Sequence, residues 1–323
     1  MRSKRDKAIL KGIQAAKELH YQLDTQSRLR SNEKRIDISS AVEHLELPMI
    51  FRPLKGLLGA YIPGEAPGII ITTERRLSIQ RYTAAHELGH YYLQHNLSAD
   101  DEAVIGRSTK HSDDIPLQEL EAEAFAGEFL LPKKLLLNIC RGLRLGKVDL
   151  KNPVNVYKIS SRAGVSYEAA AIALLNYKFI DLNTYPDVKA FPRKECKQEL
   201  LGSWERHVEK FDLDIICLNE SDNNSHIKLE SNDFVILELP EPAASGYLWQ
   251  GMDAILNLKL LEDSRKFSET ENLGGVVKRR LLLSGSGEVS VYLRLKRPWE
   301  NDIKKEFSVS LDFSGRGIGL SKV

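Results

Sequence analysis

The pentapeptide HELGH at residues 86–90 is the feature that most limits what this chain can fold into. On an α-helix, His86 and His90 lie one turn apart on the same face, so both imidazoles can reach one ion. Glu87 projects about 100° round the helix from His86, near enough to hold a water on that ion without being a ligand. Two nitrogen ligands beside a carboxylate base suit a metal-dependent hydrolase. The same letters also arise by chance, so a third ligand decides between a metal site and an ordinary polar helix face.

The segment LQELEAEAFAGEFLLP at 117–132 supplies candidates for that third ligand. Its apolar residues recur at helical spacing and Pro132 marks the end of the predicted helix. Glu119 and Glu123 are one turn apart, so both can face the histidine helix. One of them can bind the ion while the other accepts a hydrogen bond from a ligand imidazole. Two further carboxylates of the segment are interpreted as solvated surface charges, namely Glu121 and Glu128.

Together, RYTAAHELGHYYLQH and ELEAEAFAGEFLLP resemble the ImmA/IrrE family of bacterial metallopeptidases, over roughly residues 35–180. The family pattern is HELGH, then Glu-x-x-Ala-(Asn/Asp)-x-Phe-Ala, then a Leu-rich turn ending in Pro. The resemblance implies a mostly helical, zincin-like domain that binds Zn2+. It assigns the roles of ligands to His86, His90 and Glu119, and the role of general base to Glu87.

Further residues near this site have several interpretations. Glu123 stands where the family has Asn or Asp; it either contacts a ligand histidine or, if its helix is rotated, binds the metal itself. His95 occupies a position where the family often has histidine, and a packed helix residue is favoured over a ligand. The group that stabilises the oxyanion is not identified, and the candidates by residue type are Tyr61, Tyr82 and Tyr92.

The resemblance implies a specific protein substrate, often a helix-turn-helix repressor encoded nearby. The chain's own segment 156–177 is typical of a helix, a glycine turn and a second helix, which is also a DNA-binding arrangement. Its second helix, SYEAAAIALLNY, lacks the arginines and lysines that read base edges. The 46 Lys and Arg nearly cancel the 45 Asp and Glu, so no basic field attracts nucleic acid. Packing is therefore favoured over direct nucleic-acid binding.

The second half of the chain has a different pattern of apolar and polar residues. Runs such as DFVILELP, VVKRRLLLS and EVSVYLRLKR alternate apolar and polar residues, and Gly, Asn, Ser or Pro closes each run. This pattern predicts an all-β sandwich in which SGSGE is the turn of a hairpin. The fold class is therefore α+β, with a short β segment at 50–72 in the helical half. The predicted parts are a peptidase domain at 1–185 with a helical closing segment at 150–180, a linker at 186–204, and the β domain at 205–323.

Three loops of this half are similar to those of chagasin-like cysteine-protease inhibitors, a resemblance that implies an immunoglobulin-like sandwich. The motifs of that family are Asn-Pro-Thr-Thr-Gly-Tyr-x-Trp, a glycine-rich loop, and Arg-Pro-(Trp/Phe). The matching residues are Gly246, Tyr247 and Trp249, then Gly274 and Gly275, then Arg297, Pro298 and Trp299. The first loop departs from the motif, because PAASGY lacks both threonines and has one residue more. The resemblance implies loops that cluster at one end of the sandwich and enter the cleft of a papain-like protease; the alternative is that the aromatic residues pack in the core or at its rim.

The cysteine content and the lack of long apolar runs indicate the cellular compartment of the protein. The three cysteines are far apart and form no CxxC pair, which argues for a reducing environment. No run is long and apolar enough for a signal-peptide core or a membrane span, so a cytoplasmic protein with no membrane partner is expected. The leading hypothesis is a zinc endopeptidase for a specific protein, with a β domain for recognition or regulation. The alternatives are a cysteine-protease inhibitor or peptide-binding module on a peptidase-like scaffold, and a protease that its own β domain inhibits.

Overall fold

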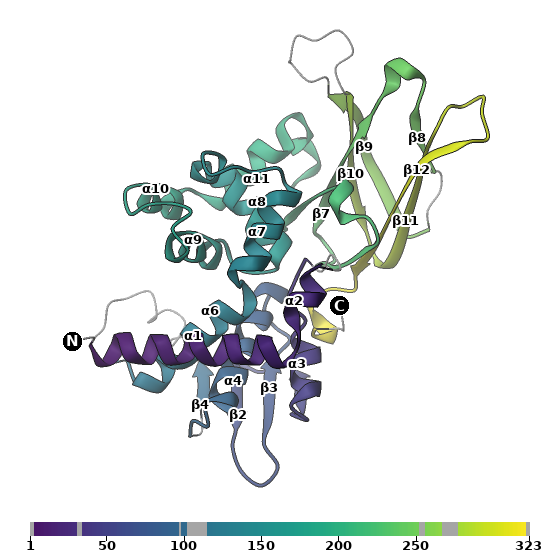
Figure 1. The fold of residues 1–323 in the computed structure, drawn as a ribbon. Coiled ribbons are helices and arrows are strands. Elements are labelled where there is room, and N and C mark those ends of the chain that lie inside the picture. The colour runs from purple at the N-terminus through teal and green to yellow at the C-terminus, as the bar shows by residue number, and fades with distance from the viewer. Residues whose placement is uncertain are drawn as a thin grey trace. The chain divides into compact units, whose positions relative to one another are not determined.

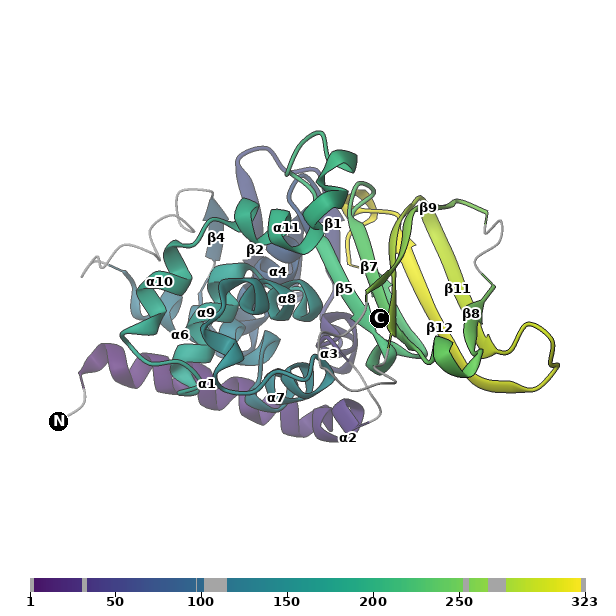
Figure 2. The ribbon, with the colours of Figure 1, turned by 90° about the horizontal axis from the view of Figure 1, so that it is seen from above.

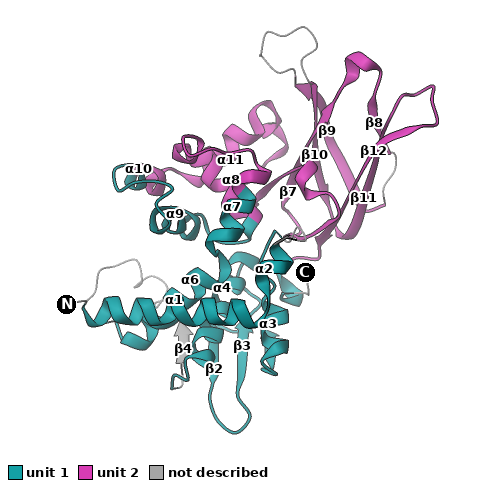
Figure 3. Ribbon diagram, viewed as in Figure 1, with its two compact units in different colours: residues 1–139, 163–186, 316–323 teal, residues 140–162, 187–315 magenta. Residues whose placement is uncertain are grey.

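A computed structural model describes the protein over residues 3–30, 34–96, 98–101, 115–251, 256–266 and 277–320. The chain forms two compact units (Figure 3). Unit 1 consists of Met1–Ile139, Ala163–Pro186 and Arg316–Val323, and unit 2 of Cys140–Arg162 and Asp187–Gly315. The predicted α+β class is confirmed, with a helical N-terminal region and a β-rich C-terminal region. Within the described ranges, no helix has both the length and the apolar character needed to cross a membrane.

The helices follow one another along the first two thirds of the chain (Figure 1). They are α1 (Lys4–Gln22), α2 (Thr25–Arg30), α3 (Ile38–His44), α4 (Leu77–Tyr92), α6 (Leu117–Leu130), α7 (Lys133–Gly142), α8 (Pro153–Ala163), α9 (Tyr167–Asn176), α10 (Thr184–Ala190) and α11 (Arg193–Leu201).

Helix α1 begins at a capping box, in which Ser3 and Asp6 each bond the other's backbone N–H. Its small and apolar side chains lie on one face, and that face packs along α6. Gly12 makes the close approach possible, because a Cβ there would lie 2.1 Å from the backbone oxygen of Glu121. The contact between α1 and α6 therefore depends on the absence of a side chain at this position.

One sheet of unit 1 supports the helix that carries HELGH. Its strands are β1 (Met49–Arg52), β2 (Leu57–Ile62), β3 (Gly68–Thr72) and β4 (Ser98–Asp101), in the order β1-β3-β2-β4. Helix α4 packs against β2 and β3 on one side and against α6 on the other. Because α4 is enclosed in this way, its residues from Thr83 to His90 are all buried, including the polar ones. The β segment predicted at 50–72 corresponds to β1, β2 and β3.

Unit 2 contains two mixed sheets, each of four strands, that face each other (Figure 2). One has the order β5-β7-β10-β9, and its strands are Ile215–Asn219, Phe234–Glu241, Val277–Gly285 and Leu258–Lys266. The other has the order β6-β12-β11-β8, with strands Ser225–Lys228, Ile303–Phe313, Gly287–Lys296 and Leu248–Gln250. Alternate apolar residues of both sheets meet in one core, which includes Leu237 and Leu283 from the first sheet and Leu293 and Val309 from the second.

The predicted hairpin at SGSGE is wrong. Strand β10 pairs with β7 and β9, whereas β11 pairs with β12 and β8, so the turn carries the chain from one sheet to the other. Gly285 permits this crossing, because a Cβ there would lie 2.8 Å from the ring of Phe313 and 3.0 Å from the backbone oxygen of Asn257. Alternation shows which side chains face the core, but it does not show which strand is the partner.

The segment 186–204, expected to be a linker, is largely helical in the structure. It contains the end of α10 and all of α11, and Pro192 is the residue that starts α11. Cys196, Leu200 and Leu201 are buried, which gives α11 an apolar face that a linker does not need. The two compact units also cross the boundaries expected from sequence, since 140–162 belongs to the β-rich unit and 316–320 to the helical one.

Candidate metal centre

The side chains of His86, His90 and Glu119 converge on one point in unit 1. The Nε2 atoms of His86 and His90 are 3.0 Å apart, and Glu119 Oε2 lies 3.3 Å from the first and 3.5 Å from the second. Both histidines are buried, and the Glu119 side chain is 16% exposed. Helix α4 supplies the two nitrogens from successive turns and α6 supplies the oxygen, as the spacing of the sequence motifs predicts.

These distances suit a metal ion with tetrahedral coordination. Ligand atoms about 2.0–2.1 Å from a zinc ion, at tetrahedral angles, are separated by roughly 3.3 Å. The three observed separations lie within a few tenths of an ångström of that value. Two imidazoles and one carboxylate are also a known donor set for catalytic zinc, which leaves the fourth position for water or substrate. The residues present therefore fit a divalent metal ion.

The surroundings keep both kinds of ligand in the form that binds a metal. Burial lowers the pKa of His90, against the opposing effect of its hydrogen bond with Glu119, so the neutral imidazole is favoured. Burial raises the pKa of Glu119, but its hydrogen bonds with His86 and His90 outweigh that effect and hold the pKa well below its ordinary value. A neutral imidazole and an ionised carboxylate are the forms that metal binding requires.

A glycine inside the motif sets the distance between the two helices. A Cβ at Gly89 would lie 3.0 Å from a ring carbon of Phe125 on α6, so a larger residue would push the helices apart. Glu119 lies on α6 and reaches the histidines of α4 only because the helices approach closely. The sequence signal for this role of Gly89 is a glycine within an apolar helical run, which is a recognised sign of close packing.

The other residues assigned to this site lie nearby on the same two helices. Glu87 follows His86 on α4 and is fully buried, and Glu123 is half-buried one turn after Glu119 on α6. The roles of general base for Glu87 and of histidine partner for Glu123 stay predictions. Among the candidate tyrosines, the ring of Tyr82 stacks beside His86 with centroids 6.2 Å apart.

The other two tyrosines pack elsewhere. The ring of Tyr61 lies edge-on to Tyr91, and that of Tyr92 lies against Phe125. Of the three residues that the sequence offered by type alone, Tyr82 is therefore the one that touches a candidate ligand.

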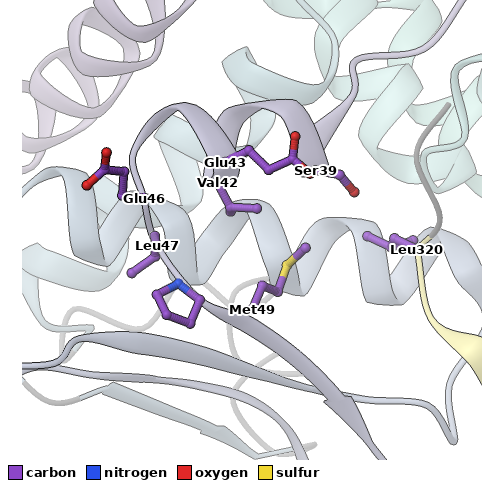
Figure 4. Close-up of a pocket in the computed structure, with 8 residues that line it drawn as sticks. Ser39, Val42, Glu43, Glu46, Leu47, Met49 and Leu320 are labelled. Carbon is purple, nitrogen blue, oxygen red and sulfur yellow. The ribbon is translucent and has the colours of Figure 1, made fainter.

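A pocket of about 430 Å³ lies elsewhere in unit 1 (Figure 4). Helix α3, the start of β1 and the C-terminal segment form it, and its lining residues are Ser39, Val42, Glu43, Glu46, Leu47, Pro48, Met49 and Leu320. None of these residues belongs to the metal cluster. The pocket and the metal cluster are therefore separate features of unit 1.

Two of the inhibitor-like loops meet at one tip of unit 2. The Nε of Arg297 donates to the backbone oxygen of Ser245 over 2.9 Å, and the guanidinium lies 4.7 Å from the centroid of the Tyr247 ring. Gly246 has φ +78°, and a Cβ there would lie 2.7 Å from the indole of Trp299. Trp299 is 72% exposed, next to the exposed Pro298.

The remaining residues matched to that motif have different positions. Trp249 is 3% exposed in the core of the sandwich, and its indole N–H donates to the backbone oxygen of Pro240 over 2.9 Å. Trp249 therefore packs in the core, which is the alternative that the sequence left open. Gly274 and Gly275 lie outside the described residues.

Among the solved structures that are similar to this chain, three cover about a third of it. A cysteine protease inhibitor, EhICP2, from Entamoeba histolytica is 20% identical, with 32% of this chain and 98% of that chain covered and a TM-score of 0.29. Amebosin is also 20% identical, with coverages of 30% and 95% and a TM-score of 0.27. PbICP-C, solved in complex with falcipain-2, is 15% identical, with coverages of 32% and 93% and a TM-score of 0.19.

No curated protein matches the chain. The model of the IrrE N-terminal-like domain, Peptidase_M78, matches residues 44–175. That range includes α4 and α6, and so all three residues of the metal cluster. The candidate metal cluster therefore lies in the part of the chain that matches the model of this peptidase family.

Proposed function

We propose that this protein is a zinc-dependent endopeptidase that cleaves a specific protein, with helix-turn-helix repressors as the first substrate class to test. The observation that carries the proposal is the convergence of three ligand atoms within 3.5 Å of one another, from His86, His90 and Glu119. The buried Glu87 follows directly on the same helix, inside a domain of a peptidase family. The substrate class rests on the sequence resemblance, and the β-rich region would serve recognition or regulation.

The roles of the protein groups follow from their chemistry. A zinc ion held by this cluster would supply Lewis acidity, which polarises a carbonyl group and makes water a better nucleophile at neutral pH. Glu87 would accept a proton as water attacks the scissile carbonyl, and would pass that proton to the amine as the C–N bond breaks. His86, His90 and Glu119 would hold the ion in place. The enclosure of α4 would exclude bulk water from Glu87 and keep its position fixed.

Replacing Glu87 with Gln is expected to abolish cleavage while leaving the fold intact, because the amide keeps the shape of the side chain but cannot accept the proton. Wild-type protein and Glu87→Gln are incubated with lysate of the source cells and with purified helix-turn-helix repressors. New protein N-termini are then labelled and identified by mass spectrometry. Wild type should generate a small set of new N-termini that Glu87→Gln does not generate.

Glu128→Gln is the matched control, since it makes the same chemical change on α6, where Glu128 accepts a hydrogen bond from Tyr177. It should cleave like wild type. Equal sets of N-termini from wild type and Glu87→Gln, in the presence of zinc, would refute the proposed peptidase activity.

A second candidate function, inhibition of papain-like cysteine proteases, is favoured by the tip of unit 2. Arg297 ties the loop of Trp299 to the loop of Gly246, so both loops present one surface. Trp299 is 72% exposed, so its indole is accessible to a partner at this tip. The tip contains the close match Arg297-Pro298-Trp299 and the loop of Gly246 and Tyr247, which departs from its motif.

If the tip is inhibitory, the protein should inhibit papain with a nanomolar-to-micromolar constant, and Trp299→Ala should weaken inhibition at least tenfold. Loss of an exposed aromatic anchor in an interface commonly costs about 2 kcal/mol or more. Tyr292→Ala is the control, because Tyr292 is 40% exposed in the middle of β11, away from the tip. Steady-state papain assays at up to high micromolar protein decide the question, and no inhibition by wild type would remove this candidate.

A further inference from the structure

The chain reverses direction directly after the HELGH helix and brings a third histidine back to the site. Helix α4 ends at Tyr92, and Gln94 adopts a left-handed conformation with φ +57°. The N–H of Gln94 bonds to the backbone oxygen of Tyr91, and that of His95 bonds to the oxygen of His90 over 2.9 Å. This pair of bonds is a Schellman motif. The motif folds His95 back over His90, although the two residues are five apart.

The imidazole of His95 then joins the buried centre to a carboxylate. Its Nδ1 lies 2.9 Å from Nδ1 of His90, and its Nε2 lies 2.9 Å from Oε2 of Glu121. The same oxygen of Glu121 pairs with Nζ of Lys11 on α1, at 2.5 Å. The side chains of His95 and Glu121 are only 7% and 12% exposed. A continuous chain of contacts thus runs from Lys11 to the candidate metal ligand.

The donor and the acceptor of each hydrogen bond in this chain of contacts follow from the protonation of the His90 ring. His90 Nε2 faces the other two ligand atoms, so metal binding requires that nitrogen to carry no proton. The proton of the neutral His90 ring is then on Nδ1, which donates to Nδ1 of His95. His95 therefore carries its proton on Nε2 and donates it to Glu121. Oε2 of Glu121 also accepts from Nζ of Lys11, so Glu121 is the acceptor in both of these hydrogen bonds.

We propose that His95 and Glu121 are positioning residues for the metal centre, which fix the tautomer and ring orientation of His90 through this relay. Both nitrogens of His95 are engaged away from the three ligand atoms, so His95 is an outer partner and not a fourth ligand. Lys11 holds Glu121 in place from α1. The inference rests on the proposed metal site and assigns to that site two residues beyond its ligands.

The test is the zinc affinity of the purified apoprotein, measured by competition with a chromophoric chelator. His95→Phe keeps the size of the ring but removes both nitrogens, and the loss of such an outer partner typically weakens metal binding about 10–100-fold. Glu121→Gln acts one bond further away and should weaken binding less than His95→Phe does. His95→Asn keeps an acceptor for the Nδ1–H of His90 and should recover most of the affinity.

Glu128→Gln is the matched control for Glu121→Gln. Lys17 and Glu128 repeat the pairing of Lys11 and Glu121 between the same two helices, at 4.0 Å, without a histidine in between. Glu128→Gln should bind zinc like wild type. The visible spectrum of the Co2+-loaded protein gives a second readout, because a reoriented His90 shifts the d–d bands of His95→Phe but not those of Glu128→Gln.

The outcomes separate this inference from the function on which it rests. If wild type binds zinc tightly and His95→Phe binds it within twofold, with an unchanged Co2+ spectrum, the relay plays no part and only this inference fails. If wild type does not bind zinc or Co2+ at all, the proposed peptidase function fails first. A graded loss, largest for His95→Phe, smaller for Glu121→Gln and absent for Glu128→Gln, supports the relay.

Discussion

Wild-type protein and Glu87→Gln are each expected to contain one equivalent of zinc, whereas His86→Ala and Glu119→Gln are expected to contain none. His86→Ala removes a ligand nitrogen, and Glu119→Gln replaces the carboxylate with a neutral amide, a much weaker zinc ligand, in a cluster whose members lie 3.0–3.5 Å apart. Two remaining ligands do not complete a protein zinc site, which takes three or four protein donors. The measurement is the metal content by mass spectrometry of protein that was purified without a chelating column.

Glu123→Gln is the control for Glu119→Gln, since it changes the next carboxylate on the same face of α6. It should keep its zinc, because Glu119 is the carboxylate that lies beside both histidine nitrogens. The opposite result, with zinc retained in Glu119→Gln and lost from Glu123→Gln, would assign the third ligand to Glu123. Circular dichroism of all the variants distinguishes loss of a ligand from loss of the fold.

The geometry of the ligand cluster is the part of the site that the sequence predicts best. The spacing of His86 and His90 needs only the pitch of a helix, and the choice of Glu119 needs only that α6 faces α4. The first condition depends only on local helix geometry, and the second depends on one contact between two helices. The structure places the three side chains together. The distance between the helices depends on Gly89, whose role becomes visible only when Phe125 is seen opposite it.

Glu121 shows why the sequence does not predict the roles of other residues near the site. It lies about 200° round α6 from Glu119, so helical spacing alone makes it a surface charge. In the structure that side of α6 faces α1 and the turn after α4, and Glu121 bonds to Lys11 and His95. The interpretation of Glu121 as solvated was wrong, because its partners His95 and Lys11 are 26 and 110 residues away in the sequence.

The alternating runs DFVILELP, VVKRRLLLS and EVSVYLRLKR lie within one residue of β7, β10 and β11, but the strand pairing predicted at SGSGE is wrong. The segment at 186–204 shows the opposite problem, since prolines and mixed charges suggested a linker where α11 forms. Pro192 starts that helix instead of preventing it, and the spacing of Cys196, Leu200 and Leu201 places them on one buried face.

Asp222→Ala is expected to lower the free energy of unfolding of unit 2 by about 3–5 kcal/mol. The Nε of Arg162, on α8, donates to Oδ1 of Asp222 over 3.0 Å, and its Nη2 contacts Oδ2. The two side chains are 2% and 0% exposed. Burial lowers the pKa of Arg162 only to about 10, so its guanidinium is still charged at neutral pH and would be left without its buried carboxylate.

Glu220→Ala is the matched control on the same turn of chain. The partners of Glu220, Lys305 and Arg144, are 49% and 82% exposed, and such surface pairs contribute about 0–1 kcal/mol. The readout is intrinsic fluorescence during urea unfolding, because all three tryptophans lie in unit 2, and Trp204 and Trp249 are buried there. A difference of less than 1 kcal/mol between Asp222→Ala and Glu220→Ala would contradict the prediction.

The effect of Asp222→Ala also shows which segments of the chain unfold together. Arg162 lies within the segment that matches the peptidase family, whereas Asp222 follows the first strand of the β-rich region. Two further contacts join the helices α7 and α8 to the chain around β5: the Tyr157 hydroxyl bonds Asp214, and Asn219 donates to the backbone oxygen of Gly142. A loss of several kcal/mol, seen by tryptophans that all follow residue 200, would mean that α8 unfolds together with the β sandwich. The peptidase fold would then end, in energetic terms, before the family segment does.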